Sequence, residues 1–233
     1  VDMLHELGVK AFKIASFDIV NLPFLRYVAS KGLPVILSSG MSHLGDIEEA
    51  LDAISQEKNP NIILLHCVSA YPADISDINL NAIITMKKTF RVPVGYSDHT
   101  IGPLASNVAF SLDADVVEKH FTLDKSLAGP DHWFSSDYKE FKELVKQIRL
   151  AEKRMGNAAL EPANSEMELL DQWKLGLVWD RNVTKGSKIT KKDIAVRKPA
   201  TGLRPKELDF IIGQQTVRSC KKGEFVLKSD YLD

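Results

Sequence analysis

Two histidines, His99 and His120, each follow a short apolar run at the point where a predicted strand gives way to polar residues. Val116 and Val117 precede the second histidine, and β-branched residues of this kind favour strands. Residues 102–113, between the two motifs, have the length of a helix. Active sites of parallel α/β folds lie at the carboxyl ends of strands, so the two imidazoles are expected to meet there. Two neutral imidazoles at one place could share a divalent metal ion.

Each predicted strand of this region ends in side chains that are able to hold an anion or a sugar. A lysine with several hydroxyls suits phosphate, and carboxylates suit sugar hydroxyls. Any one of these residues alone would be read as an ordinary loop residue or helix cap, but a series at equivalent positions favours a binding site. The positions are Lys13, Ser16, Ser38, Ser39, Ser69, Tyr71, Ser97, Asp98, Glu118, Lys119 and Thr122, with Asp131 and His132 in the loop that follows.

Three other histidines have simpler interpretations. His5 and His43 are expected at the surface or beside a helix, and His66 lies in the most apolar strand and is predicted to be a hydrogen-bonded core residue. Two histidine ligands would leave positions of a metal ion open for water and substrate. That arrangement suits a Lewis acid acting on an oxygen substrate better than a structural zinc site, which is closed by four ligands.

Strand-like and helix-like segments alternate up to about residue 157. Near-continuous apolar strands predict a parallel sheet that is covered on both faces. The capping residues of the last helix are predicted to be Asp137 and Gly156. The predicted strands are residues 9–16, 33–40 and 61–69 and the runs PVGYS and DVVEKH, and the predicted helices are residues 22–31, 47–57, 80–90, 102–113 and 137–155.

Five βα units fit either an open doubly wound sheet or part of an eight-stranded barrel. No glycine-rich dinucleotide fingerprint follows any strand, which weakens the first alternative. Residues 1–8 resemble the end of a helix whose strand is absent. We therefore expect an α/β fold of the TIM-type (β/α)8 class over residues 1–157, lacking about three βα units at its start.

The last third of the chain differs in composition. Residues 158–175 are predicted to be a polar linker, and residues 176–233 to be a small, mainly β domain, with short β-like runs between KGS, KPATG and KKGE turns. From residue 172 onward 14 Lys and Arg oppose 7 Asp and Glu, a net charge of +7, whereas the preceding residues carry −8. Such a basic domain could contact nucleic acid, an anionic substrate or the acidic domain. The aromatic interleaving of a single-strand binder is absent, which argues against nucleic acid.

The overall composition is that of an ordinary soluble globular protein, with 44% hydrophobic and 26% charged residues. The two cysteines, Cys67 and Cys220, lie too far apart to read as a disulfide framework, so a reducing, cytoplasmic compartment is expected. No apolar run approaches the roughly 18 residues of a membrane helix, and no signal peptide is evident.

The motifs KIAS, SSGM, LLHCVSAYP, INL, GYSDHT, EKHFTL and GPDHWFS occur in an order that resembles the sialic acid synthase family. These enzymes make N-acetylneuraminic acid and related nonulosonic acids from phosphoenolpyruvate and a hexosamine. The resemblance covers essentially the whole chain, and residues 176–233 resemble the SAF (antifreeze-like) domain of the family. It implies a (β/α)8 barrel, a divalent metal ion (Mn²⁺ or Mg²⁺), and a transferase activity that releases phosphate.

The resemblance also implies roles for individual residues. His99 and His120 match the two metal-binding histidines, and Glu118 and Asp131 match positions that face the amino sugar. The positions that match the phosphoenolpyruvate site are Lys13, Ser16, Ser38, Ser69, Tyr71 and Ser97.

The family also implies a homodimer in which the SAF domain of one subunit closes the other subunit's site through a basic residue. Arg197 and Lys198 match that residue, and Lys198 stands before the proline where the family favours arginine, so the planar fork is lost. The basic pair usual at the start of the SAF domain is altered to Lys174 and Leu175. The Glu, Lys and Gln of the family's first barrel strands have no counterpart here.

Several alternatives remain open from the sequence. The sugar is N-acetylmannosamine or a diacetamido sugar of the legionaminic or pseudaminic acid type; LLHC and GPDH favour the neuraminic and legionaminic branches, and ASFDIV favours the pseudaminic branch. A metal-dependent aldolase or another phosphoenolpyruvate–aldehyde synthase would share the loop chemistry but would lack the SAF domain. A catalytically incomplete fragment is the third reading, because five barrel units would leave two open sheet edges.

Overall fold

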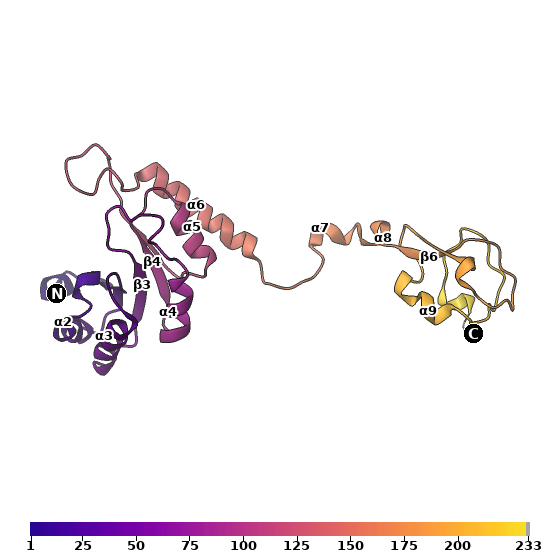
Figure 1. Cartoon of the computed structure of the whole chain (residues 1–233), viewed down its shortest axis with the longest axis horizontal. Coiled ribbons are helices and arrows are strands. Elements are labelled where there is room, and N and C mark those ends of the chain that lie inside the picture. The colour runs from indigo at the N-terminus through magenta and orange to yellow at the C-terminus, as the bar shows by residue number, and fades with distance from the viewer. Residues whose placement is uncertain (232–233) are drawn as a thin grey trace. The chain divides into compact units, whose positions relative to one another are not determined.

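A computed structural model describes residues 1–231. The chain divides into two compact units, Val1–Asn157 and Ala158–Asp233 (Figure 1).

The first unit is built on a parallel sheet of five strands in the order β1-β2-β3-β4-β5. The strands are β1 (Phe12–Ile14), β2 (Val35–Ser38), β3 (Ile62–Cys67), β4 (Val94–Asp98) and β5 (Val117–Lys119). A short helix, α1 (Asp2–Glu6), precedes the sheet, and each strand is followed by one of the helices α2 (Leu22–Ala29), α3 (Leu44–Gln56), α4 (Ala82–Phe90), α5 (Leu104–Ser111) and α6 (Tyr138–Met155) (Figure 1). The five predicted βα units and the parallel sheet are therefore confirmed.

The sheet is curled into a half-barrel. Lys13 lies on β1 and Glu118 on β5, at opposite edges of the sheet, yet the Lys13 Nζ and Glu118 Oε1 atoms are 3.5 Å apart. A flat sheet would hold these two edges four strand spacings apart, at about 4.8 Å each. The curl therefore brings the carboxyl ends of all five strands around one concave face.

Alternate residues of each strand determine which face of the sheet is packed by helices. Phe12, Ile14, Val35, Leu37 and Leu64 are buried in one core together with helix residues. Their strand neighbours point to the opposite side, because successive side chains of a strand alternate between its faces. We call the concave side the inner face; it carries Lys13, Ser38, Cys67, Ser97 and Glu118.

The helix boundaries follow local capping chemistry. Asp137 accepts a hydrogen bond from the Glu140 amide at the start of α6, and Gly156 ends that helix with a φ of 63°, so both predicted caps are confirmed. Helix α3 begins at Leu44 rather than at residue 47 as predicted, because the Asp46 carboxylate accepts from the backbone N–H of His43 and fixes an earlier start.

The strands are shorter than the sequence predicted. Residues 9–16 were expected to be extended, but β1 ends at Ile14, and a single 3-10 turn, Ser16–Asp18, follows at once. Strand ends therefore pass into loops within one or two residues, which leaves their polar side chains at the rim of the sheet.

The second unit has little regular structure. The predicted linker, residues 158–175, contains two short helices, α7 (Asn164–Met167) and α8 (Leu170–Trp173). Two antiparallel strands follow, β6 (Gly176–Trp179) and β7 (Ile194–Arg197), and one short helix, α9 (Leu208–Ile211). The other β-like runs form only single bridges, such as Val183 with Cys220.

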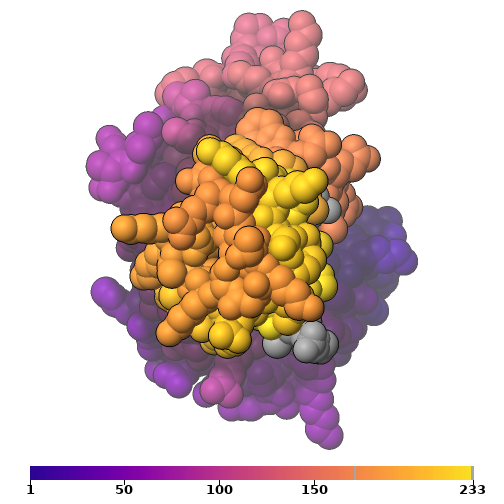
Figure 2. Space-filling view, turned by 90° about the vertical axis from the view of Figure 1, so that its right-hand side faces the viewer, coloured from indigo at the N-terminus to yellow at the C-terminus, as the bar shows by residue number. Residues whose placement is uncertain are grey.

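Early and late segments of the second unit interleave. Leu177 accepts a hydrogen bond from the Val226 amide and Trp179 donates one to Glu224, so orange and yellow segments lie side by side in Figure 2. A small core of Leu177, Trp179, Ile189, Ile211 and Val226 is almost fully buried. Among residues 1–231, no helix has the length and apolar character that crossing a bilayer requires.

Candidate functional site

The two histidines of the sequence motifs lie together at the carboxyl ends of β4 and β5. The ring centroids of His99 and His120 are 5.2 Å apart, and the Tyr71 ring lies 4.3 Å from the first and 5.6 Å from the second. Phe134 packs against His120 at 5.1 Å. Aromatic side chains on two sides thus limit the directions in which the imidazoles can turn.

The orientation of His99 is set by a backbone carbonyl. Its Nδ1 atom lies 2.8 Å from the oxygen of Val68, and a carbonyl oxygen only accepts, so Nδ1 carries the proton and donates. The Nε2 atom is 3.4 Å from Ser97 Oγ, which itself donates to Glu118 Oε1 at 2.7 Å. The Nε2 lone pair of His99 therefore remains available, as it does in metal-binding histidines whose other nitrogen is held by a carbonyl.

A metal ion at this place would find two imidazole donors and few others. Among the side chains that the structure describes, residues 1–231 apart from Asp171, no group of three or more His, Cys, Asp or Glu is gathered at a spacing that would hold a metal ion. The two imidazoles, whose ring centroids are 5.2 Å apart and of which His99 is oriented by the Val68 carbonyl, would suit an ion whose other positions are completed by water or substrate.

Two carboxylates border the histidine pair. Glu118 lies between Ser97 and Lys13 on the inner face. The Oδ2 atom of Asp131 is 3.8 Å from His120 Nδ1, and the Asp131 side chain is half exposed. Both carboxylates can therefore reach a polar molecule bound over the two imidazoles.

Hydroxyl groups converge on the neighbouring strand ends. The Ser16 Oγ atom accepts a hydrogen bond from the Gly40 amide at 3.0 Å. A Cβ atom added at Gly40 would collide with Ser69 Oγ and lie 2.8 Å from Ser16 Oγ, so the glycine is what allows these two hydroxyls to approach each other. Ser38 is 2% exposed, and its Oγ has no hydrogen-bond partner in the described chain. A buried hydroxyl without a partner is costly, which marks this spot as one that a ligand could complete.

Five residues that the sequence offered as binding groups are engaged in hydrogen bonds or an ion pair within the fold. Ser39 donates its hydroxyl hydrogen bond to the Leu65 carbonyl at 2.9 Å. Thr122 Oγ1 lies 2.8 Å from His132 Nδ1, so both stabilise the loop after β5. Asp98 and Lys119 pair with each other on the helix side of the sheet, away from the inner face.

The ionisation of the histidine pair is asymmetric. Burial alone would lower the pKa of His99, but its contacts with Cys67 and Val68 outweigh burial and hold that pKa above its ordinary value. Burial, together with the neighbouring His99, lowers the pKa of His120. His120 therefore stays neutral, and able to ligate, to lower pH than His99.

Two residues beside the histidine pair were missed as candidates in the sequence. Cys67 lies 3.9 Å from His99 Nδ1 and 4.0 Å from Ser69 Oγ. Burial raises its pKa, but hydrogen bonding to His99 outweighs burial, so the pKa of this thiol is lowered. Phe134, which packs on His120, was also missed. Period-two alternation from the core residues of β3 would have placed Cys67 beside the site.

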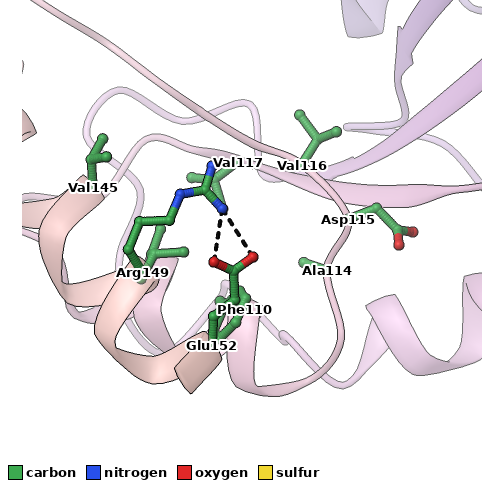
Figure 3. A pocket seen from close by; sticks show the side chains of 9 residues that line it. Phe110, Ala114, Asp115, Val116, Val117, Val145, Arg149 and Glu152 are labelled. Carbon is green, nitrogen blue, oxygen red and sulfur yellow. Dashed lines mark hydrogen bonds and ion pairs between the residues drawn. The ribbon is translucent and has the colours of Figure 1, made fainter. Parts of the chain in front are cut away.

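The first unit has two further hollows, of which the second adjoins the site through Cys67. One of about 340 Å³ lies among α5, β5 and α6, where Arg149 and Glu152 form an ion pair beside apolar side chains (Figure 3). Another, of about 680 Å³, is bordered by Ser39 and Cys67 and by residues of α3 and α4. Neither hollow is lined by His99 or His120.

The candidate basic residues of the second unit lie near its two-stranded sheet. Arg197 ends β7 and forms an exposed ion pair with Asp180 at 3.8 Å. The Lys198 ammonium lies 4.9 Å from the centroid of the Trp173 ring. Both side chains are accessible, and their predicted role toward a partner subunit stays a prediction.

A curled parallel sheet whose strand ends carry paired histidines, carboxylates, a lysine and hydroxyls is the layout of a barrel-type enzyme site. A sequence model of the NeuB family matches residues 1–159, and one of the SAF domain matches residues 176–232. The N,N'-diacetyllegionaminic acid synthase of Legionella pneumophila is 40% identical over 97% of this chain and 65% of that protein. A pseudaminic acid synthase of Campylobacter jejuni is 34% identical over 99% of this chain and 67% of that protein.

Among solved structures, the N-acetylneuraminic acid synthetase of Leptospira borgpetersenii in complex with citrate is 43% identical, with a TM-score of 0.67 over 72% of this chain and 59% of that chain. The chain thus spans about two thirds of the length of the relatives that it matches. It belongs to the NeuB family, with a SAF domain at its C-terminal end.

Proposed function

We propose that this chain is the catalytic and SAF part of a nonulosonic acid synthase, which condenses phosphoenolpyruvate with an N-acetylated hexosamine and releases phosphate. The observation that carries the proposal is the pairing of His99 and His120, 5.2 Å apart, at the end of an inner face that also carries a lysine, two carboxylates at or near the pair, and the buried Ser38 hydroxyl without a partner. Relatives named as legionaminic, pseudaminic and sialic acid synthases support the reaction class.

In this reaction the methylene carbon of phosphoenolpyruvate forms a bond with the aldehyde carbon of the open-chain sugar. Water then adds to the resulting cationic carbon, and phosphate leaves with cleavage of its C–O bond. A divalent ion, Mn²⁺ or Mg²⁺, supplies Lewis-acid polarisation of the aldehyde when bound. His99 and His120 would hold that ion, because one imidazole nitrogen of His99 is already oriented by the Val68 carbonyl.

The remaining residues orient the two substrates. Lys13 and the hydroxyls of Ser16, Ser38, Ser69, Tyr71 and Ser97 would hold the phosphate and carboxylate of phosphoenolpyruvate. Glu118 and Asp131 would accept hydrogen bonds from the sugar. Most of the expected rate gain comes from such orientation, which fixes the distance between the two reacting carbons.

We further propose that the five βα units are part of a complete (β/α)8 barrel. The curl of the sheet and the free edges of β1 and β5 support it, as does the greater length of the relatives. The proposed active assembly is a homodimer in which Lys198, with Arg197, reaches the partner's site from the SAF domain.

The sugar is either N-acetylmannosamine or a 2,4-diacetamido sugar. Identity of 40% to a legionaminic acid synthase against 34% to a pseudaminic acid synthase supports a sugar of the legionaminic type within the second group. The 43% identity to an N-acetylneuraminic acid synthetase supports N-acetylmannosamine as the alternative sugar.

The test is phosphate release from phosphoenolpyruvate with Mn²⁺ and each sugar in turn. It is run on this chain and on a version extended upstream by three βα units of a relative. We expect release by the extended protein that EDTA abolishes and that His99→Ala or His120→Ala lowers by at least a hundredfold. His5→Ala, an exposed histidine of α1, is the matched control. Wild-type turnover by either variant of the histidine pair would contradict the proposal.

A further inference from the structure

A buried ion pair lies directly behind the histidine pair. The Lys119 Nζ atom is 3.0 Å from Asp98 Oδ2, and the two side chains are 2% and 0% exposed. Lys119 also donates to the Thr100 carbonyl at 2.8 Å, and Asp98 accepts from Ser106 Oγ of α5 at 2.5 Å. Both charges are therefore paired, hydrogen-bonded and out of water, between the sheet and α5.

The pair is placed by the register of the two strands. Asp98 and Lys119 are directly paired residues of β4 and β5, and each is followed by one histidine of the site. Because side chains alternate along a strand, the histidines lie on the inner face when the ion pair lies on the helix side. A slip of one residue between β4 and β5 would bury a histidine and expose a charge of the pair.

The same carboxylate also fixes the backbone on both sides of His99. Asp98 Oδ1 accepts from the Thr100 amide and from the Thr100 hydroxyl, each at 2.8 Å. His99 therefore sits between two residues that one carboxylate ties together. Strand β5 has only three residues, and its ladder with β4 offers little resistance of its own to a shift of His120.

We propose that Asp98 and Lys119 are positioning residues that set the separation and register of His99 and His120. The proposal rests on the function proposed above, in which these histidines hold the divalent ion. Its physical basis is that a buried charge pair is strong only in one geometry, so the two strand ends have one preferred alignment. Neither residue touches the ion or a substrate.

The first test is Mn²⁺ affinity of the whole chain, measured from the electron paramagnetic resonance signal of free Mn²⁺. Lys119→Met is expected to weaken binding by about 10- to 100-fold, as loss of an outer contact to a metal-binding histidine commonly does. The matched control is Lys87→Met. Lys87 pairs with Asp113 at 2.7 Å and with Asp115 at 3.2 Å at the other end of the same strands, and its loss should leave Mn²⁺ affinity within about twofold.

A second variant separates positioning from folding. Lys119→Met leaves the Asp98 carboxylate buried without its cation and can prevent folding. Asp98→Asn combined with Lys119→Met removes both charges, so the chain should fold with a melting temperature near that of the wild type. We expect this double variant to bind Mn²⁺ about tenfold more weakly all the same, because the ion pair on the helix side is then gone and the Ser97–Glu118 hydrogen bond is the side-chain contact left between the two strand ends. Wild-type affinity in the folded double variant would overturn the proposal.

A crystal structure of the double variant without metal tests the positioning role independently of the proposed metal-binding function. If the wild-type chain binds no Mn²⁺, the function proposed for the histidines fails, yet the structure still reports on positioning. A His99–His120 ring separation that departs from 5.2 Å by more than about 1 Å would support the positioning role. An unchanged separation would overturn it, whatever the metal affinity.

Discussion

Both units of the chain contain buried carboxylates, but these carboxylates have different structural roles. In the first unit Asp98 pairs with Lys119 across two strands that already share a ladder, one residue away from the candidate site. In the second unit Asp230 accepts from Trp179 Nε1, from the Leu227 amide and from Arg218, and thereby joins segments that have almost no ladder.

This difference shows which interactions stabilise the fold of each unit. The first unit has a five-stranded sheet and a large apolar core, so its buried pair can be devoted to alignment. The second unit has two four-residue strands and a core of few side chains, so hydrogen-bonded carboxylates replace missing regular structure. Loss of a buried carboxylate should therefore unfold the second unit but misalign the first.

The largest expected effect is that of Asp230→Ala. Asp230 is fully buried, and its removal leaves the indole N–H of Trp179 and the Leu227 amide without their acceptor, whereas the half-exposed Arg218 keeps Glu224; we therefore expect the second unit to lose about 2–4 kcal/mol. Amide hydrogen exchange should show lost protection after residue 176 only. The control is Asp209→Ala, whose side chain is 87% exposed and whose loss should cost less than about 0.5 kcal/mol. Equal loss of protection in both units would contradict the conclusion that Asp230 stabilises the second unit alone.

The substitution Asp193→Asn tests, through its pH dependence, whether another buried carboxylate stabilises the second unit. Burial alone would raise the pKa of Asp193, but Arg181 and Thr190 outweigh burial and hold that pKa below its ordinary value. A lowered pKa means that the ionised carboxylate stabilises the fold above the unfolded-state pKa, about 3.9, and that this contribution is lost as the pH falls through the folded-state pKa.

We therefore expect Asp193→Asn to cost about 2 kcal/mol at pH 7, and the difference from the wild type to shrink steadily below about pH 4. Urea unfolding of both proteins at several pH values measures it. A difference that grew on acidification would show that the charge of Asp193 does not stabilise this unit.

A smaller effect is expected from Gly40→Ala on the inner face. The added methyl group would collide with Ser69 Oγ and crowd Ser16 Oγ, so we expect a loss of about 1–3 kcal/mol in the first unit and weaker phosphoenolpyruvate binding. Gly45→Ala is the matched control, because a Cβ there meets nothing within 4 Å and the residue lies in the first turn of α3. Isothermal titration with phosphoenolpyruvate and thermal unfolding report the two effects.

The smallest effect on stability is expected from Lys198→Ala. The ammonium lies over the Trp173 ring in an exposed setting, so its loss should cost no more than about 1 kcal/mol. Thermal unfolding of the second unit measures this. A loss as large as that of Asp230→Ala would mean that Lys198 holds the SAF fold, and would weaken its proposed role toward a partner subunit.

The sequence predicted the order of the elements well, because period and capping are local. Apolar periodicity placed the five βα units, Asp137 and Gly156 delimited α6, and His66 was expected to be hydrogen-bonded in the core. Its Nε2 atom lies 2.7 Å from the Ile78 carbonyl and its ring stacks on Tyr96, but the residue is half-buried and borders the larger hollow beside α3 and α4.

The sequence did not predict which polar residues turn inward. Asp98 and Lys119 looked like binding groups by residue type. Asp98 lies two residues after the buried Tyr96 on β4 and therefore faces the helices, and Lys119 is its register partner on β5 and faces the same side. The roles assigned to the thirteen strand-end and loop side chains stay predictions, since residue type alone does not settle which bind a substrate. The structure of the second unit was harder to predict, because single β-bridges and buried carboxylates produce no periodic pattern in the sequence.

The most direct measurement is the number of Mn²⁺ ions bound by the wild-type chain, His99→Ala, His120→Ala and the control His5→Ala, each confirmed as folded by thermal unfolding. If the histidine pair is the metal site, the wild type and the control bind one ion, and both variants of the pair lose it. Binding of one ion by all four proteins, or by none, would contradict the assignment of His99 and His120.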